Sequence, residues 1–258
     1  MHVLLDPDAH PVVAHRGASA RAPENTLRAF ELALEEGADA LELDVHATTD
    51  GIAVVVHDPT LDRTTDATGA VSKLPLERVR AADAGARFSP DGGRTFPWRG
   101  RGLRIPTLDE VLVAFPTTPL IIEIKAASAQ AAVRRTLVER RAVDRCVVMA
   151  FKANALTLFR ESPWLTGAST ADVRRLLLQT ALGRPLRDVP YQTLSIPERW
   201  RGLPLPIRRI AAVARLVDKP VHIWTVDSPM RAQRLWRAGV SGIVTNDPAR
   251  IIDARARL

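Results

Sequence analysis

The sequence predicts an α/β protein of the closed (β/α)8 barrel type, and three observations lead to this expectation. Eight short apolar runs alternate with amphipathic, helix-like stretches, which is typical of parallel strands joined by right-handed crossovers. A length of 258 residues suits one such barrel. Charged residues lie at the C-terminal ends of several runs, which is where barrels of this type carry their active sites. An open doubly wound sheet is the alternative, and the lack of a G-x-G-x-x-G motif after a strand disfavours it.

The apolar runs have the length of buried strands, and the stretches between them repeat apolar residues every three or four positions. In chain order, the expected strands are 11–15, 40–45, 120–125, 146–150, 166–169, 193–196, 221–226 and 242–245. The expected helices are 26–36, 107–115, 129–140, 153–161, 171–182, 207–217 and 229–238. The single cysteine, Cys146, lies in an apolar run and is expected to be a small buried side chain without a disulfide partner.

One segment breaks the alternation, after the second expected strand. Another apolar run at 52–57 follows too closely for a helix to intervene, and Asp50-Gly51 is a strong hairpin signal. If these two residues form the loop, Asp44 pairs with His57 and both side chains share a face. Residues 60–106 then lack periodicity and are expected to form a lid or small subdomain over the barrel mouth. The chain is therefore expected to be one barrel domain, 1–258, with an insertion at about 60–106.

Two short strings with a period of two carry the strongest chemical signal. Alternate residues of a strand point the same way, so Glu42 shares a face with Asp44, and Glu123 with Lys125. Charged side chains are rarely buried without partners, and apolar neighbours argue against a solvated edge strand. The three carboxylates are the ligand type that Mg²⁺ or Ca²⁺ prefers. Lys125 forms either a plain ion pair or a contact with a substrate oxygen.

The first expected strand ends in His15-Arg16-Gly17. Histidine transfers protons near neutral pH, and the planar fork of arginine matches phosphate oxygens. Such a pair at a strand end is also common by chance, so it carries little weight alone. Pro23-Glu24-Asn25-Thr26 is typical of a helix start with a capping side chain. Near the tip of the seventh expected strand, Trp224 fits a core position and a pocket wall equally well.

Taken in order, these motifs resemble those of the glycerophosphodiester phosphodiesterases. The motifs are HRG at 15–17, ENT at 24–26, E-x-D at 42–44, D-G at 50–51, H-D at 57–58, E-I-K at 123–125, W-T-V at 224–226 and G-I-V-T-N-D-P at 242–248. The first third is the most specific part, because five spaced elements agree in order. Two positions depart from the family pattern. Ala150 precedes Phe151 where a serine is frequent, and Asn246 stands where an aspartate is frequent, which leaves the contacts to the alcohol uncertain.

The resemblance implies a TIM-type barrel with a small insertion after the second strand's hairpin. It also implies hydrolysis of glycerophosphodiesters to glycerol 3-phosphate and an alcohol, with one divalent cation, Mg²⁺ or Ca²⁺. The implied metal ligands are Glu42, Asp44 and Glu123. The implied acid–base pair is His15 and His57. The implied substrate-binding residues are Arg16 and Lys125 at the phosphate and Trp224 at the glycerol.

Other functions remain open at this stage. A phospholipase D-like enzyme acting on lysophospholipids would use the same groups with a more apolar pocket, and Phe88, Phe96 and Trp98 of the insertion allow for this. A non-catalytic barrel that binds phosphorylated ligands is a second alternative. A formal net charge of +7 permits a nucleic-acid binder, but the arginines are scattered without interleaved aromatic residues, so no nucleic-acid partner is expected.

Neither a signal peptide nor a membrane-spanning run is expected. The sequence thus favours a cytoplasmic enzyme with a small-molecule phosphodiester substrate. It leaves peripheral membrane contact and the oligomeric state open.

Overall fold

Eight parallel strands form the barrel in the computed structural model, which describes residues 2–182 and 189–258. Their spatial order is β6-β5-β4-β2-β1-β11-β10-β7. A parallel bridge between Gly167 and Thr193 joins the ends of this order, so the sheet closes on itself. The strands are β1 (Val12–His15), β2 (Ala40–Ala47), β4 (Leu120–Ile124), β5 (Cys146–Met149), β6 (Leu165–Thr166), β7 (Leu194–Pro197), β10 (Val221–Trp224) and β11 (Gly242–Thr245). The predicted (β/α)8 fold is confirmed.

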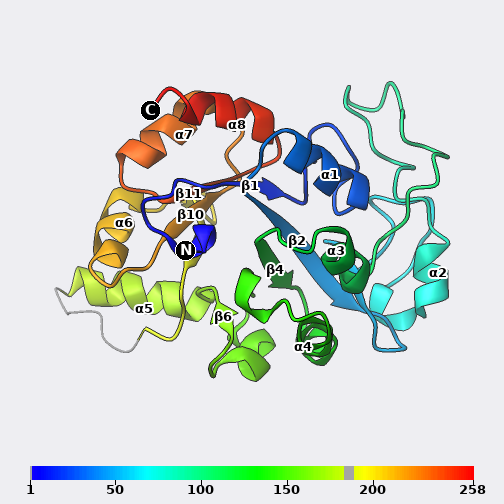
Figure 1. The fold of residues 1–258 in the computed structure, drawn as a ribbon, viewed down its shortest axis with the longest axis horizontal. Helices are drawn as coiled ribbons and strands as arrows, with labels where there is room; N and C mark the ends of the chain where they lie inside the picture. The colour runs from blue at the N-terminus through cyan, green and yellow to red at the C-terminus, as the bar shows by residue number, and fades with distance from the viewer. Residues whose placement is uncertain (1, 183–188) are drawn as a thin grey trace.

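Helices surround the sheet (Figure 1). They are α1 (Leu27–Glu35), α3 (Leu108–Ala114), α4 (Gln130–Glu139), α5 (Thr170–Ala181), α6 (Ile207–Arg215), α7 (Pro229–Arg237) and α8 (Pro248–Arg255). The stretch predicted as a helix over 153–161 is instead the 3₁₀ helix η5 (Ala153–Phe159). The last helix, α8, was not among the predicted elements. No helix of the described residues is long and apolar enough to cross a bilayer.

The strands read as continuous apolar runs because both of their faces are covered. Outward side chains pack under the helices, while inward ones such as Val13, Ile121 and Val244 form a separate cluster. Leu4 of the 3₁₀ helix η1 (Val3–Leu5) joins that inner cluster, so the N-terminal segment covers the barrel centre in Figure 1. This packing fills one end of the barrel and leaves the C-terminal strand ends for polar side chains.

The hairpin after β2 differs from the predicted register by one residue. The strand β3 (Ala53–Val55) pairs with β2 so that Val45 lies opposite Val55, and Val56 donates its N–H to the Asp44 carbonyl at 2.9 Å. Asp44 therefore does not pair with His57, and that prediction is wrong. The physical reason is a loop of three residues, 49–51, in which Gly51 adopts a φ of +73°. Three-residue hairpin loops commonly end on such a left-handed residue.

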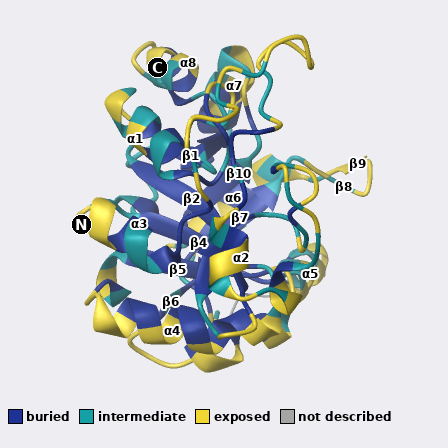
Figure 2. Cartoon of the chain, turned by 90° about the vertical axis from the view of Figure 1, so that its right-hand side faces the viewer, coloured by how far each residue is buried: buried dark blue, intermediate teal, exposed yellow. Residues whose placement is uncertain are grey.

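The insertion builds a small core of its own against the β2–β3 hairpin. It contains the 3₁₀ helix η2 (Val71–Lys73) and the short helix α2 (Leu76–Arg80). Leu61, Val71, Val79 and Ile105 are buried together with Val54 of β3. Residues 60–106 contribute no strand to the barrel, as expected. A second, mostly exposed hairpin, β8 (Arg199–Trp200) and β9 (Leu203–Pro204), projects from the barrel in Figure 2.

Candidate active site

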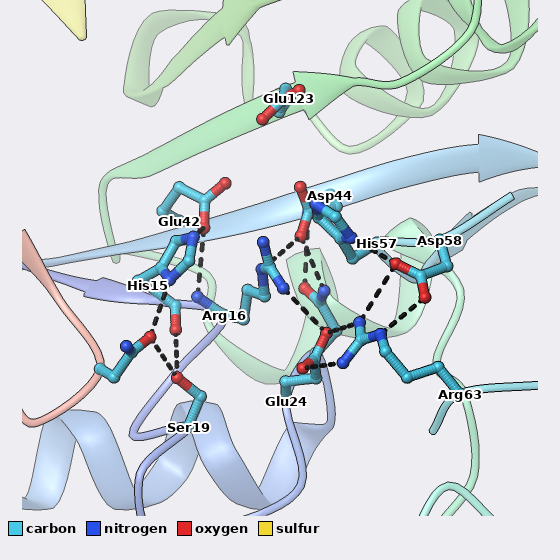
Figure 3. A network of polar contacts seen from close by, with 12 residues as sticks. His15, Arg16, Ser19, Glu24, Glu42, Asp44, His57, Asp58, Arg63 and Glu123 are labelled. Carbon is cyan, nitrogen blue, oxygen red and sulfur yellow. Dashed lines mark hydrogen bonds and ion pairs between the residues drawn. The ribbon is translucent and has the colours of Figure 1, made fainter. Parts of the chain in front are cut away.

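Strand register brings three carboxylates together at the C-terminal end of the barrel. His15 of β1 is the register partner of Glu42 on β2, and Asp44 is the partner of Glu123 on β4. Since all three strands are parallel neighbours, this register brings these side chains close together. Oxygens of Glu42, Asp44 and Glu123 lie within 4.8 Å of one another (Figure 3). These residues were predicted to lie together, and the structure brings them together.

The electrostatics of this cluster fit a divalent cation. Burial raises the pKa of Glu42 well above its usual range, and the neighbouring Asp44 and Glu123 raise it further. The pKa of Asp44 is instead lowered, because Lys125 and Arg16 outweigh the opposing effect of its burial. Asp44 Oδ1 is buried and accepts no hydrogen bond from the described residues. An all-oxygen donor set of three buried carboxylates is typical of a Mg²⁺ or Ca²⁺ site.

Two cations border the carboxylates. Lys125 Nζ lies 2.9 Å from Glu123 Oε1 and 3.3 Å from Asp44 Oδ1. Arg16 adopts a φ of +58° directly after β1, and its N–H points at the carbonyl and carboxylate of Glu42. Its guanidinium contacts Asp44 Oδ2 and Glu24 Oε1, each at 3.0 Å. Both cations are thus held by carboxylates at the rim of the cavity.

His15 and His57 each have one ring nitrogen occupied. His15 Nδ1 lies 2.8 Å from Asn246 Oδ1, which also accepts the Ser19 hydroxyl, so the histidine donates. Asp227 holds Asn246 by accepting its side-chain and backbone N–H groups. His57 Nδ1 lies 2.6 Å from Asp58 Oδ1. Neither Nε2 atom has a hydrogen-bond partner among the described residues, and His15 Nε2 lies 4.0 Å from Glu42 Oε2.

Both rings line one cavity of about 490 Å³. The same cavity is lined by Arg16, Glu42, Glu123, Lys125 and Trp224, so seven of the eight predicted site residues border it. The eighth, Asp44, lies beneath it and is 1% exposed. Although the hairpin register is shifted, His57 still reaches the cavity because β3 has ended at Val55. The Trp224 ring meets Phe151 edge-on at 5.7 Å, which settles its position as a pocket wall.

The insertion was expected to be a lid or a small subdomain, and it packs as a small subdomain beside the cavity. None of its residues lines the cavity. Trp98 donates its ring N–H to the Arg21 carbonyl at 3.3 Å, and Phe96 packs under the Arg99 guanidinium at 4.0 Å. In a segment without periodicity, apolar residues can pack within the segment itself or contact a ligand. The sequence alone does not distinguish these two roles.

Sequence reasoning missed the polar network behind the site. Arg63 of the insertion contacts both oxygens of Glu24 at 2.7 and 2.8 Å, and its Nε lies 2.6 Å from Asp58 Oδ2. Arg63 and then His57 hold the pKa of Asp58 at about 2, against the opposing effect of burial. The only sequence signal for Arg63 is its position five residues after His57-Asp58. Thr26 is the cap of α1, as its motif suggested, whereas Glu24 serves the site.

Another missed residue is Asn25, which is buried and has a φ of +58°. It donates its side-chain N–H to Asp44 Oδ2 at 2.9 Å and accepts the Asp44 backbone N–H at 3.3 Å. The loop after β1 thereby fixes the orientation of the most buried carboxylate. A helix-start motif hides this role, because asparagine is common in such motifs for capping alone.

Fold and site together are those of a barrel enzyme in which carboxylates, two histidines, an arginine and a lysine border one cavity. Residues 15–250 match the profile of the Glycerophosphoryl diester phosphodiesterase family. A glycerophosphodiester phosphodiesterase of Caldanaerobacter subterraneus subsp. tengcongensis is 31% identical over 94% of this chain and 96% of its own. The chain therefore belongs to the glycerophosphoryl diester phosphodiesterase family, and it is an enzyme of that kind, a phosphoric diester hydrolase.

Solved structures show the same fold. The glycerophosphoryl diester phosphodiesterase domain of an uncharacterized Mycobacterium tuberculosis protein superposes with a TM-score of 0.83 at 22% identity, covering 96% of this chain and 99% of its own. A phosphodiesterase of Oleispira antarctica, in complex with the product sn-glycerol-3-phosphate, has a TM-score of 0.76 at 25% identity. It covers 95% of this chain and 96% of its own.

Proposed function

We propose that this enzyme hydrolyses glycerophosphodiesters to glycerol 3-phosphate and an alcohol, with His15 and His57 as the acid–base pair. The observation that carries the proposal is the shared cavity, which both histidines line together with Glu42 and Glu123 while Asn246 and Asp58 occupy their Nδ1 atoms. The Oleispira antarctica structure, which holds sn-glycerol-3-phosphate as product, supports the choice of product.

The two histidines have different partners, and this assigns their roles. His15 donates Nδ1–H to the neutral Asn246 amide, and burial together with Arg16 lowers its pKa. A neutral ring with a free Nε2 lone pair is suited to take a proton from the nucleophile, either water or the neighbouring glycerol hydroxyl. His57 donates to the carboxylate of Asp58, which can stabilise a positive ring. We therefore assign His15 as the base and His57 as the acid that protonates the leaving alcohol.

The reaction also requires that the negative charge on the phosphate be stabilised. Arg16 and Lys125 border the cavity and would bind the non-bridging phosphate oxygens, while Trp224 would lie against the glycerol. Glu42, Asp44 and Glu123 would hold one divalent cation, Mg²⁺ or Ca²⁺. When bound, the cation would neutralise charge on the phosphate as a Lewis acid.

A panel of glycerophosphodiesters with different alcohols tests the proposal, with glycerol 3-phosphate as the measured product. His15→Ala and His57→Ala should each lower turnover by about 10²–10⁴, because proton transfer is lost while little packing changes. The control is His10→Ala, which removes a histidine outside the cavity. EDTA should abolish activity, and added Mg²⁺ or Ca²⁺ should restore it. Near-normal turnover of either histidine variant, with circular dichroism showing the parental fold, would remove that residue from the mechanism.

A further inference from the structure

A pocket separate from the catalytic cavity lies between the insertion and the loop that joins β1 to α1. It encloses about 570 Å³ and shares no lining residue with the cavity. The loop contributes Glu24 to its wall, and the insertion contributes Arg63, Thr64, Arg87 and Phe88. The reaction proposed above makes no use of this pocket.

The wall of this pocket is positively charged. Among the described residues that line it, the charged ones are Arg63, Arg87 and Glu24. Glu24 accepts hydrogen bonds from Arg63 at 2.7 and 2.8 Å and from Arg16 at 3.0 Å, so both of its oxygens are occupied. A cationic ligand would therefore find no free carboxylate, whereas an anion would meet two guanidinium groups.

Both arginines have hydrogen-bond donors left for a ligand. Of the five N–H groups that a guanidinium carries, Arg87 uses only Nε–H, which donates to the Thr65 carbonyl at 2.7 Å. Its two terminal nitrogens have no partner among the described residues, and the Nε–H bond holds them in place. Arg63 makes four contacts to the oxygens of Glu24 and Asp58, so one of its five N–H groups remains.

The shape of these donors indicates which anion would bind. A phosphate monoester presents three acceptor oxygens, which the planar forks of two arginines match, and the Thr64 hydroxyl can donate as well. A carboxylate has too few oxygens to fill both forks. Pro23, Ala84 and Phe88 give the pocket an apolar side. The carbon part of an ester can pack there, whereas inorganic phosphate would leave this surface in contact with water.

We propose that this pocket binds a small phosphate monoester and that the bound anion slows the enzyme through Arg63. Figure 3 shows the Arg63 guanidinium between Asp58, the partner of His57, and Glu24, the partner of Arg16. An anion that attracts Arg63 toward the pocket weakens its contacts to both carboxylates. The binding does not depend on the proposed function, whereas the effect on turnover rests on the roles proposed for His57 and Arg16.

Steady-state kinetics with glycerophosphocholine separates the pocket from the catalytic cavity. A phosphate monoester in the cavity competes with the substrate and raises KM, whereas one in the pocket lowers kcat at saturating substrate. Saturating methyl phosphate should lower the kcat of the parent about tenfold, a typical coupling between two sites. Arg87→Ala and Thr64→Val should each keep the parental kcat without the anion, lose most of the kcat effect and retain the KM effect. Arg94→Ala is the matched control, because it removes an exposed arginine of the insertion outside the pocket.

The same assay with other ligands identifies the group that is recognised. Methyl phosphate and glycerol 3-phosphate should each lower kcat at a lower concentration than inorganic phosphate, because only the esters cover the apolar side of the pocket. Glycerol, which has no charge, should leave kcat unchanged. An equal effect of inorganic phosphate would overturn the assignment to a monoester, and an effect of glycerol would overturn the assignment to an anion.

Calorimetry gives a readout that does not depend on turnover. Arg87→Ala should bind one equivalent of glycerol 3-phosphate fewer than the parent and the Arg94 variant. Equal stoichiometries, or purely competitive inhibition of the parent, would overturn the pocket while the proposed function stands. A raised KM of Arg87→Ala without added anion would also overturn it, because the pocket would then belong to the substrate. The expected loss of one equivalent in a protein that hydrolyses no glycerophosphodiester would contradict the proposed function and retain the pocket.

Discussion

Arg63 links the insertion to both sides of the active site. Its guanidinium contacts Asp58, the partner of His57, and Glu24, the partner of Arg16. Two ionised carboxylates would otherwise repel one another at the entrance of a site that binds an anion. A single bidentate cation neutralises them and fixes their side chains, which lysine could do only as a point charge. If His57 and Arg16 have their proposed roles, Arg63 would act on them only through Asp58 and Glu24, since it does not line the cavity.

The Arg63→Ala variant should lower kcat about 10- to 100-fold, which is typical when a partner of a catalytic or ligating residue is removed. The alkaline limb of the pH–rate profile, which reports the proposed acid, should also move, because Asp58 and His57 lose their fixed geometry. Arg63→Lys should recover part of kcat. The control is Arg94→Ala, which removes an exposed arginine from the same insertion. If the pH profile of Arg63→Ala were unchanged, Arg63 would contribute to local structure only and would not influence the acid–base groups.

His222 predicts how stability depends on pH. Burial is the main reason that its pKa falls to about 4, and His2 lowers it further. Both ring nitrogens lack hydrogen-bond partners among the described residues. The folded pKa lies below the unfolded value of about 6.5, so the unfolded chain binds the proton more tightly. The associated stability is present above pH 6.5 and is lost as the pH falls toward 4.

Between pH 7 and pH 5, this group should cost the parent protein about 2 kcal/mol of unfolding free energy. His222→Leu should remove that part of the decline, because leucine has no proton to gain. Urea denaturation at the two pH values measures the difference. The other histidines with lowered pKa values remain in both proteins and cancel in the comparison. An equal decline in parent and variant would show that His222 is not buried in its neutral form.

At the scale of elements, the sequence was sufficient to predict those strands and strand faces that follow from a single pattern of apolar and polar residues. Strands covered on both faces are continuous apolar runs, so all eight were found. The period of two then placed Glu42 beside Asp44. The β2–β3 hairpin was predicted one residue out of register because Asp-Gly fits both a two-residue and a three-residue loop. Whether Gly51 ends the loop depends on pairing across the whole hairpin, which no local pattern records.

Two glycines with positive φ values should respond very differently to substitution. At Gly51 a Cβ would meet no atom within 4 Å, so Gly51→Ala should cost only the left-handed backbone strain, about 1 kcal/mol. At Gly17 a Cβ would lie 2.5 Å from the Ala29 backbone carbon. Gly17→Ala should therefore displace the loop that carries Arg16 from α1, destabilise the protein by more than Gly51→Ala and lower turnover.

Thermal melts and turnover measured side by side check this pair. Gly51→Ala serves as the control, because it introduces left-handed backbone strain without a steric clash of the new Cβ. If the two variants proved equally stable and equally active, the close approach of the first loop to α1 would not be required for the site.

At the scale of the whole molecule, the barrel explains why the convergence of the candidate site residues could be predicted and the contacts that hold them could not. Closure brings the ends of β1, β2 and β4 to one edge, so residues at those ends had to converge. Glu24, Asn25 and Arg63 lie instead in the first loop and the insertion, where contacts depend on how irregular segments pack. From the sequence, Asn246 was recognised only as a departure from the family pattern, in which an aspartate is frequent. In the structure its side chain hydrogen-bonds to His15.

The net charge of +7 predicts how association depends on salt. A positive surface with Arg16 and Lys125 at the cavity draws anions inward, and dissolved ions screen this attraction. For glycerophosphoglycerol, which carries a net negative charge, kcat/KM should fall several-fold between low and high ionic strength. Glycerophosphocholine is the matched substrate, because its quaternary ammonium cancels the phosphate charge while the reacting bonds are the same. Its kcat/KM should fall less. Parallel salt dependences for the two substrates would locate the effect at the metal site or the phosphate contacts, and the surface charge would then have no role in capture.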